Sequence, residues 1–371
     1  MKTLNFLSAT ALFLLPVLIG QSGECCRTIQ QSLLAAVGDN DHSAKISNPG
    51  FFQSIMSSRN KAGFQQIDLQ DPQGRTRIVQ VRYTSGLPSQ TSDSATDICS
   101  PGDTESEKYA NVSTNYYKEI KLTLDDGEFE TFCATQSEFR DEMTRKKLNQ
   151  LYGAINTDLV TEATANFGNF WNTGANAALS VPLISSTGTP VYWGETEILD
   201  SFEDAELTER PFLVGSGFLR KYTRLQNIAC CNDGGLDISA DNSFDYFRDG
   251  AVDSVIGSSN NIIGFAPGAY QLVKTNRFVG QFEKSDNYKT KTTVVDPASG
   301  LTLDLSVYYD WCENPGDEND RSKWIITWGL RYGLFILPTD LAEPATPWDG
   351  VNSTFHFQAT CGEVAPCDEP S

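Results

Sequence analysis

Apolar and polar residues alternate along several stretches of the chain, and this alternation predicts β-strands. The segments TRIVQVRY (76–83) and NYYKEIKLTLD (115–125) alternate with a period of two and are rich in β-branched and aromatic residues. We expect these two segments to pair as a long hairpin. The connection between them, residues 84–114, is polar and has too little apolar content to fold alone, so we expect an extended insertion there.

The pattern changes at Thr135, where apolar residues begin to recur at helical spacings. The sequence TQSE (135–138) is a capping box, which pairs the first backbone N–H groups of a helix. The recurring apolar positions are Phe139, Met143, Leu148, Leu151, Ile155, Leu159 and Ala163. We therefore predict an amphipathic helix over residues 135–166, which at 1.5 Å per residue would be roughly 40 Å long.

The next part of the chain mixes strand and helix patterns. Residues 181–198 are strand-like with a turn at Gly188, and an acidic loop follows. The segment RPFLVGSGFLRKYTRLQ (210–226) predicts a short strand ending at Val214, a turn, and an amphipathic helix. The segment NNIIGFAPGAYQLVKTNRFVG predicts two strands around a turn formed by Gly264, Pro267 and Gly268.

Two later segments predict an antiparallel sheet. KTKTTVVDPASGLTLDLSVYYDW (289–311) predicts two strands joined by an Asp-Pro turn, and KWIITWGLRYGLFILP (323–338) predicts a third. A long helix early in the chain and a sheet late in the chain can pack together only if the chain returns over a large insertion. The predicted fold class is therefore α+β, with a discontinuous main domain.

The amino-terminal segment allows two interpretations. Residues 4–20 form an apolar run after a single Lys and before small residues, which is the pattern of a secretory signal peptide. The same run, interrupted by Pro16, could instead form a helical arm that covers a neighbouring subunit. Residues 27–64 predict short helical pieces broken by Gly38 and Gly63, and we expect them to belong to the arm rather than to a core. No other stretch approaches the ~20 apolar residues of a membrane span.

The charge of the chain argues against one class of partner. The formal net charge is −20 with a pI near 4.5, so we expect no sequence-specific binding to nucleic acid, whose phosphates attract basic surfaces. The charge is uneven, because residues 195–210 are strongly acidic whereas Arg220, Lys221 and Arg224 have no acids nearby in the sequence. Such unevenness suits electrostatic pairing between copies, although a solvated face is the commoner explanation.

The cysteines predict neither a disulfide scaffold nor a metal site. The chain has nine cysteines, an odd number, with no CxxC pair and only two histidines, His42 and His356, which lie far apart in sequence. We expect free thiols in a reducing compartment. No feature of the sequence lowers the pKa of the vicinal pairs at 25–26 and 230–231.

Candidate catalytic groups are acidic. Asp304, Asp310 and Glu313 lie near Trp311 and Trp324, and glycoside hydrolases use two carboxylates beside aromatic residues. Structural roles are far commoner for such residues. The acidic tracts 232–242 and 310–321 do not match a calcium loop, and the two histidines do not suggest a nucleophilic triad. We predict no catalytic residue, no cofactor and no metal.

The order of the predicted elements resembles the Hong Kong phage type of tailed-bacteriophage major capsid protein. The segments RPFLVGSGFLRKY, NIIGFAPGAYQLVKTNRFVG, KTTVVDPASGLTLDLSVYYDWC and LFILPTD are similar to capsid proteins of phages that infect Bacteroidota, including crAss-like phages. The resemblance covers residues 27–344. Its motifs are turns and strands rather than catalytic signatures.

The resemblance implies a domain organisation for the α+β fold. It consists of an N-terminal arm (1–64), an extended β-hairpin loop (65–134), a peripheral domain with a long spine helix (135–185), an inserted axial domain (186–288), the peripheral sheet (289–340) and a C-terminal tail (341–371).

The resemblance also implies a function. A protein of this kind is not an enzyme; it assembles with copies of itself, as pentamers and hexamers, into the icosahedral head that encloses phage DNA. The expected place is the virion, assembled in the host bacterial cytoplasm. Portal, scaffold and decoration proteins are further expected partners, and a membrane is not.

Charge placement suggests the contacts between copies. The expected contact residues are Arg77, Arg82, Lys118 and Lys121 on the hairpin and Glu203, Asp204 and Glu206 on another copy. The alternative from the sequence is a secreted or periplasmic disulfide-containing binding protein with a cleaved signal peptide. A carbohydrate hydrolase is a third class, and it would need two close carboxylates in a cleft.

Overall fold

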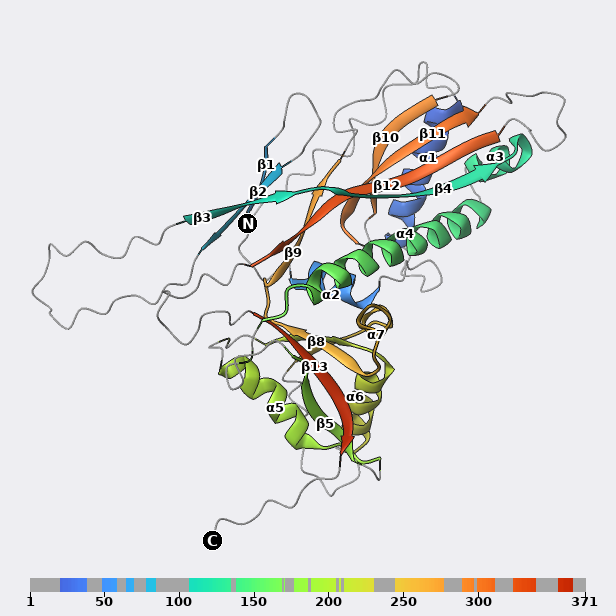
Figure 1. The fold of residues 1–371 in the computed structure, drawn as a ribbon. Coiled ribbons are helices and arrows are strands. Elements are labelled where there is room, and N and C mark those ends of the chain that lie inside the picture. The colour runs from blue at the N-terminus through green and yellow to red at the C-terminus, as the bar shows by residue number, and fades with distance from the viewer. Residues whose placement is uncertain are drawn as a thin grey trace, which may run out of the picture. The chain divides into compact units, whose positions relative to one another are not determined.

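The computed structural model contains two compact units, each built from three chain segments (Figure 1). Unit 1 comprises Met1–Ser47, Tyr117–Leu151 and Asn276–Leu330, and unit 2 comprises Asn48–Tyr116, Tyr152–Thr275 and Arg331–Ser371. The structure describes residues 21–38, 49–58, 65–69, 78–84, 107–134, 138–168, 170, 177–185, 188–204, 207, 210–229, 244–276, 289–296, 299–310, 323–337 and 353–362. The mixture of helices and sheets confirms the predicted α+β class.

The predicted late sheet forms the main sheet of unit 1. Strand β10 (Lys289–Asp296) pairs antiparallel with β11 (Leu301–Asp310), which pairs antiparallel with β12 (Lys323–Ile336), and β4 (Tyr116–Leu124) lies next to β12. The turn after β10 closes with a hydrogen bond from the Gly300 N–H to the Asp296 carbonyl, and Gly300 has a positive φ of 67°. The predicted hairpin of β10 and β11 is therefore confirmed.

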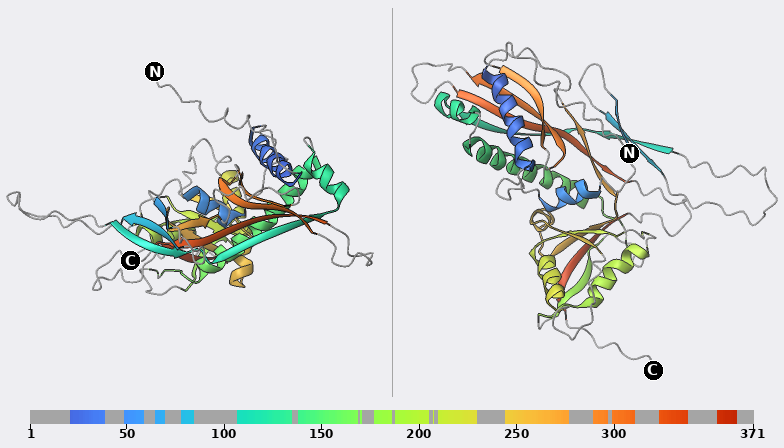
Figure 2. Two further views of the ribbon diagram at one scale, coloured as in Figure 1. Left: turned by 90° about the horizontal axis from the view of Figure 1, so that it is seen from above. Right: turned by 180° about the vertical axis from the view of Figure 1, so that it is seen from behind.

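Alternation along the strands gives this sheet one apolar face. Leu303, Leu305 and Val307 of β11 are buried, whereas Ser306 and Tyr308 point to the opposite face and are partly exposed. Helix α1 (Gln21–Gly38) packs against β10 and β11, as Figure 2 also shows.

The prediction that the first 64 residues form an arm rather than a core is wrong for α1. Cys25, Cys26, Ile29 and Leu33 are buried, because these positions share one face of the helix. The Gln30 side chain donates a hydrogen bond to the Val295 carbonyl and accepts one from the Val295 N–H. It therefore pairs the backbone groups of Val295 at the edge of the sheet, where β10 has no neighbouring strand. The apolar run before α1 lies outside the described residues.

Two further features of unit 1 differ from the predictions. Helix α3 (Asp126–Cys133) follows β4 directly and begins with a capping box formed by Asp125 and Glu128. The predicted capping box at 135–138 lies partly outside the described residues. A disulfide joins Cys25 of α1 to Cys133 of α3, so the expectation of free thiols is wrong for this pair.

The predicted long helix is present as α4 (Glu138–Thr164). Its buried apolar residues include Leu148, Leu151, Ile155 and Leu159, which were predicted from their spacing. Residues up to 151 belong to unit 1 and those from 152 to unit 2.

Unit 2 contains a three-stranded antiparallel sheet in the order β1-β2-β3. The strands are β1 (Gln65–Leu69), β2 (Ile78–Thr84) and β3 (Glu107–Ser113). The predicted pairing of 76–83 with 115–125 is wrong, because β2 pairs with β3, which lies inside the connection that was expected to be extended. Charged and polar residues in EKYANVS hide the strand pattern, and β4 instead completes the unit 1 sheet.

The second sheet of unit 2 has the order β5-β13-β8-β6-β7. Its strands are β5 (Leu179–Ser185), β13 (Thr354–Gly362), β8 (Asn261–Phe265), β6 (Phe212–Gly215) and β7 (Asp245–Arg248). The expected C-terminal tail is wrong for β13, which lies between β5 and β8 and buries Phe355 and Phe357. The predicted short strand and following helix are confirmed as β6 and α6 (Gly217–Ala229).

Helices cover this sheet. Helix α5 (Tyr192–Glu203) and α6 share one buried cluster with the strands, so they cover the same face (Figure 1). The strand-like prediction for 181–198 is correct up to Ser185 and wrong from Tyr192, where α5 begins. Tyr192 and Trp193 are β-formers and Gly194 is a poor helix former, but Gly194 lies so close to the Pro182 carbonyl that no larger residue fits.

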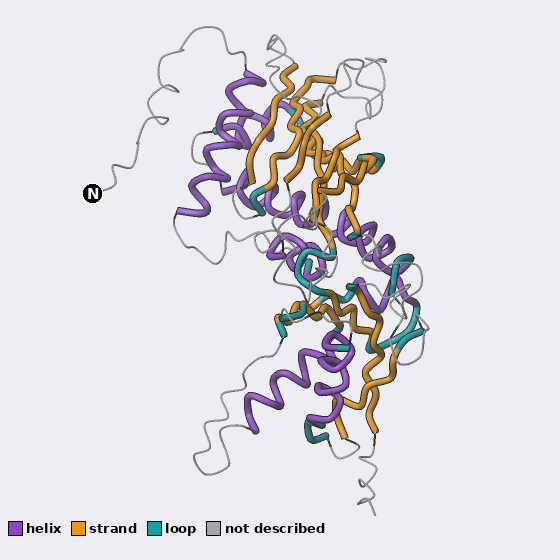
Figure 3. The backbone as a smooth tube through the Cα atoms, turned by 90° about the vertical axis from the view of Figure 1, so that its left-hand side faces the viewer, coloured by secondary structure: helices purple, strands orange, loops and turns teal. Residues whose placement is uncertain are grey.

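The remaining elements of unit 2 are α2 (Gly50–Ser58), α7 (Ala251–Ile256) and β9 (Tyr270–Thr275), which pairs with residues 331–336 of β12. Figure 3 shows these helices and strands by type. Phe51 of α2 contacts Phe265 and Tyr270. Gly264 lies within β8 and not in the predicted turn, whereas Gly268 does turn the chain, with a φ of 86°.

Candidate functional site

The described residues among those predicted to contact another copy lie on different elements. Arg77 and Glu206 lie outside the described residues. Arg82 belongs to β2, in the three-stranded sheet of unit 2, whereas Lys118 and Lys121 belong to β4, in the sheet of unit 1. Lys118 and Lys121 are three positions apart in a strand, so their side chains point to opposite faces. The prediction that all four basic residues lie on one hairpin is therefore wrong.

Two of the three predicted acidic partners are neighbours at one end of α5. Glu203 is the last residue of α5 and Asp204 is its C-cap, and both are exposed. Carboxylates at a helix C-terminus are unfavourable because they face the negative end of the helix dipole. Helix stability therefore does not explain this acidic cluster, and a role in contacts with another molecule is consistent with it.

The two candidate catalytic carboxylates that the structure describes lie far apart from each other. Asp304 is 2% exposed within β11, whereas Asp310 is exposed at the end of the same strand. Six residues of strand separate their backbones by about 20 Å, which is far more than the carboxylate spacing of either glycosidase mechanism. Glu313 and Trp311 lie outside the described residues.

A small pocket lies on the polar face of the unit 1 sheet. Its volume is about 160 Å³, and it is lined by Tyr117, Glu119, Lys121, Lys291, Asp304, Ser306, Tyr308 and Thr327. Lys121 donates to Glu119 over 3.0 Å, and this hydrogen bond is the main cause that raises the pKa of Lys121. The pocket is smaller than the ~300 Å³ at which ligand sites begin. Two bases and two acids balance each other in it, so it does not select a charged substrate.

A second pocket, of about 380 Å³, lies in unit 2 and is lined in part by Tyr116, Glu162 and Phe335. Tyr116 donates a hydrogen bond to Glu162, which raises the pKa of Tyr116 to about 12. Nearby, Tyr332 donates to Asp158 over 2.7 Å, and burial together with this bond raises the pKa of Tyr332. Both phenols therefore stay protonated at neutral pH and serve as hydrogen-bond donors rather than as bases.

His356 is a structural residue of β13. Its Nε2 lies 3.0 Å from Asn261 Oδ1, and its ring stacks on Phe167. Asn261 Oδ1 can only accept, so Nε2 carries the proton. Burial lowers the pKa of His356, which keeps the ring neutral near pH 7. No nucleophile is paired with it among its described contacts.

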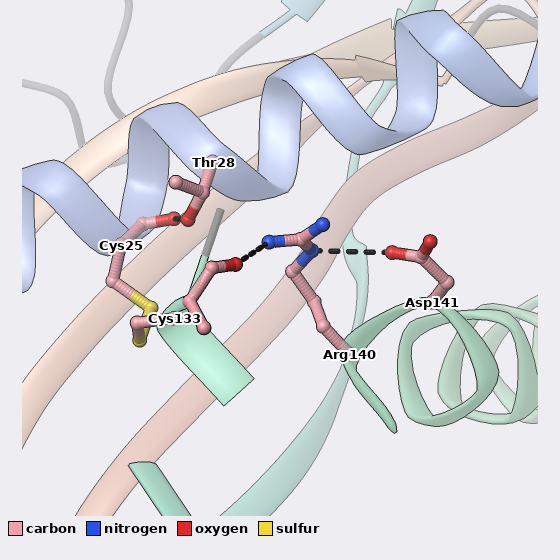
Figure 4. The surroundings of a disulfide bond; sticks show 6 residues. Cys25, Thr28, Cys133, Arg140 and Asp141 are labelled. Atoms are coloured by element: carbon pink, nitrogen blue, oxygen red, sulfur yellow. Dashed lines mark hydrogen bonds and ion pairs between the residues drawn. A yellow bond between two sulfur atoms is a disulfide. The ribbon is translucent and has the colours of Figure 1, made fainter. Parts of the chain in front are cut away.

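The disulfide joins two helices of unit 1, α1 and α3 (Figure 4). Near it, the Arg140 guanidinium of α4 donates to the Ala134 carbonyl over 2.6 Å and to Asp141 over 3.1 Å. Arg140 is buried, so these bonds compensate for its loss of hydration. Phe129 of α3 stacks on Trp324, with ring centroids 3.9 Å apart. These contacts hold α3 against α4 and β12.

Cys26 of α1 is not reactive. Cys26 is buried, and burial raises its pKa to about 12, so almost no thiolate forms at neutral pH. Within the described ranges, no group of three or more His, Cys, Asp or Glu side chains could hold a metal ion. None of the helices in the described part of the chain is long and apolar enough to cross a membrane.

The fold is similar to solved phage structures. A structure from Mycobacterium phage Che8 is 10% identical, with a TM-score of 0.42, over 84% of this chain and 92% of that one. A structure from Mycobacterium phage Adephagia is 12% identical, with a TM-score of 0.43, over 88% of this chain and 94% of that one.

A third similar structure is the capsid asymmetric unit of cyanophage A-1(L), which is 13% identical, with a TM-score of 0.40, over 76% of this chain and 88% of that one. No protein-family model and no curated protein matches the sequence.

Proposed function

We propose that the chain is a structural protein, the major capsid protein of a tailed phage, which assembles with copies of itself into an icosahedral shell around phage DNA. The observation that carries this proposal is the discontinuous fold. The unit 1 sheet takes β4 from before α4 and β10, β11 and β12 from after a long insertion. The resemblance of the sequence to phage capsid proteins implies this order of a hairpin region, a long helix, an insertion and a closing sheet.

The chemistry of the described residues supports a structural role. The tyrosines with raised pKa values act as donors, the half-buried histidine is neutral, and the two carboxylates on β11 are far apart. A shell gains its stability from many repeated weak contacts, and such contacts need shaped surfaces rather than activated groups.

The proposed partners are copies of the same chain, arranged as pentamers and hexamers, in a virion that is assembled in the host bacterial cytoplasm. In this proposal the acidic end of α5, with Glu203 and Asp204, is one contact surface, and Arg82 on β2 belongs to another. Portal, scaffold and decoration proteins are further proposed partners. A relation to phages of Bacteroidota rests on the similar sequence segments alone.

Light scattering coupled to size exclusion tests the proposal. The purified full chain should elute as rings or shells whose share rises with concentration, because assembly follows mass action. A chain that stays monomeric at every concentration, with its fold intact by circular dichroism, would refute a shell-forming role.

One observation favours the second candidate, a secreted or periplasmic binding protein. Cys25, which forms a disulfide with Cys133, lies shortly after the signal-like segment. Disulfides persist mainly in oxidising compartments. Intact mass distinguishes the candidates: a secreted protein would begin near Gln21 or Glu24 and would be monomeric. A shell subunit associates whether or not these residues are removed.

A further inference from the structure

Helix α5 carries an acidic stripe on its exposed side. The helix has four acidic residues and no basic one. One side of the helix carries residues spaced by three or four positions, which therefore form a stripe: Trp193, Glu197, Asp200 and the C-cap Asp204. We call these four residues, three of which are acidic, the acidic stripe. Trp193 is 57% exposed, which is unusual for so large an apolar side chain. Exposed Trp residues among polar neighbours often anchor protein interfaces.

The neighbouring helix α6 carries the opposite charge. It has three basic residues and no acidic one. Arg220, Lys221 and Arg224 of α6, with Arg248 at the end of β7, form what we call the basic flank. Burial raises the pKa of the Tyr246 phenol, and the charges of Arg248, Arg220 and Arg224 oppose this rise.

The two charged surfaces point away from each other. Tyr222 of α6 donates a hydrogen bond to Glu195 of α5 over 2.8 Å, so these two residues mark the sides on which the helices face each other. At 3.6 residues per turn, the acidic stripe lies about 140–180° around α5 from Glu195. By the same count, Arg220 and Arg224 lie about 160° around α6 from Tyr222. Unit 2 therefore has an acidic side and an opposite basic side.

We propose that the acidic stripe of one copy docks onto the basic flank of the next copy, so that unit 2 joins head to tail around a ring. Charge complementarity identifies a second copy as the occupant, because the same unit presents both surfaces. A two-fold contact would bring acidic stripe against acidic stripe, or basic flank against basic flank. A head-to-tail contact avoids this repulsion, and it closes into a ring when the rotation between copies allows it.

Within the contact, Trp193 packs against the arginine side chains of the next copy. Arginine stacks well on an indole face, and the carboxylates of the stripe accept hydrogen bonds from the same guanidinium groups. This inference rests on the proposed shell function and names the partner surface within it.

Two charge-reversal variants test the contact. One carries Glu197→Lys and Asp200→Lys on the acidic stripe, and the other carries Arg220→Glu, Lys221→Glu and Arg224→Glu on the basic flank. Each should weaken self-association about tenfold or more, because like charges then face each other. Raising the salt from about 0.05 M to about 0.5 M should also weaken the wild-type contact, because salt screens exposed charges. The matched control is Glu130→Lys with Glu138→Lys, which changes the net charge as the first variant does but lies in unit 1.

Mixing the two variants is the decisive step. Each variant alone has like charges on both sides of unit 2, but the two kinds can alternate around a ring. The mixture should therefore regain association and form rings with an even number of copies only, as measured by mass photometry.

Three outcomes would overturn the inference. If the wild type assembles and both reversals assemble equally well, the contact is wrong while the proposed function stands. If the control loses as much association as the variants, or if the mixture does not recover, net charge rather than this contact governs assembly. If the wild type never associates, the proposed function fails as well.

Discussion

Asp249 shows how single residues hold unit 2 together. Its buried carboxylate accepts hydrogen bonds from the N–H groups of Phe51 and Ala251 and from the Asn156 side chain, each over 2.8 Å. Asn156 in turn accepts from the Phe52 N–H over 2.9 Å. One carboxylate therefore links α2, α4 and the start of α7.

Replacing Asp249 should be costly. Asp249→Ala leaves three donors without their acceptor, so we expect the free energy of unfolding to fall by about 2–4 kcal/mol in chemical denaturation. Glu130→Ala, at an exposed position of α3, is the control and should change it by less than about 0.5 kcal/mol. Equal effects of the two substitutions would contradict the described network.

His356 predicts a pH dependence of stability. Burial lowers the folded-state pKa of His356 below its usual value of 6.5, so the folded protein binds this proton less readily than the unfolded chain does. The stability that the neutral ring provides is complete above pH 6.5, and it is lost as the pH falls from 6.5 through the lower folded-state pKa. His356→Gln keeps a donor for Asn261 but does not titrate, so its unfolding midpoint should fall less than that of the wild type between about pH 7.5 and pH 5.5. Parallel curves for the two proteins would contradict this role.

At the scale of elements, two glycines have opposite consequences. In β8, a Cβ on Gly264 would lie 2.8 Å from Phe357 and 3.0 Å from Leu213, whereas nothing lies within 4 Å of a Cβ on Gly153 in α4. Gly264→Ala should destabilise the protein by about 1–3 kcal/mol because it overpacks the core. Gly153→Ala should stabilise it by about 0.5–1 kcal/mol because alanine favours the helix. Thermal unfolding measures both, and a stabilising Gly264→Ala would refute the packing of β8.

The disulfide links two distant elements of unit 1 covalently. It joins residues 108 positions apart in unit 1, so it restricts the unfolded chain strongly. The double variant Cys25→Ala with Cys133→Ala should lower the free energy of unfolding by about 2–4 kcal/mol. In the folded wild type, Cys26 should resist alkylation, because it is buried and protonated. Rapid labelling of Cys26, identified by peptide mass, would contradict the packing of α1.

Strongly periodic elements were predictable from the sequence. The helix α4, the hairpin of β10 and β11, and the β6–α6 pair have a clear pattern within one segment. The pairing of β2 with β3 was not predictable, because β3 has a charged residue, Lys108, at a position that alternation with Ala110 and Val112 would make apolar. The Cys25–Cys133 pair also depends on contacts between distant segments, which no local pattern encodes.

Some misses had a local signal. Phe355, Phe357 and Ala359 alternate with polar residues, so β13 could have been predicted as a strand. Lys118 and Lys121 could have been separated by strand parity alone. The acidic stripe becomes visible only when α5 is recognised as a helix, because its members share a face at helical spacing and not at strand spacing.

At the scale of the whole molecule, acidic and basic residues are concentrated on different elements. The net charge of −20 keeps copies apart in general, so association needs a local surface that overcomes this repulsion. In unit 2, α6 has only basic charged residues and α5 only acidic ones. The account therefore predicts self-association that depends on orientation and on salt.

Cryo-electron microscopy of particles formed by the purified full chain tests the central claim most directly. The account predicts closed icosahedral shells, or free rings of five or six copies as capsomers, in which α5 of one copy lies beside α6 of the next. A chain that remains solitary at every concentration, or that forms only amorphous aggregates without symmetry, would contradict it.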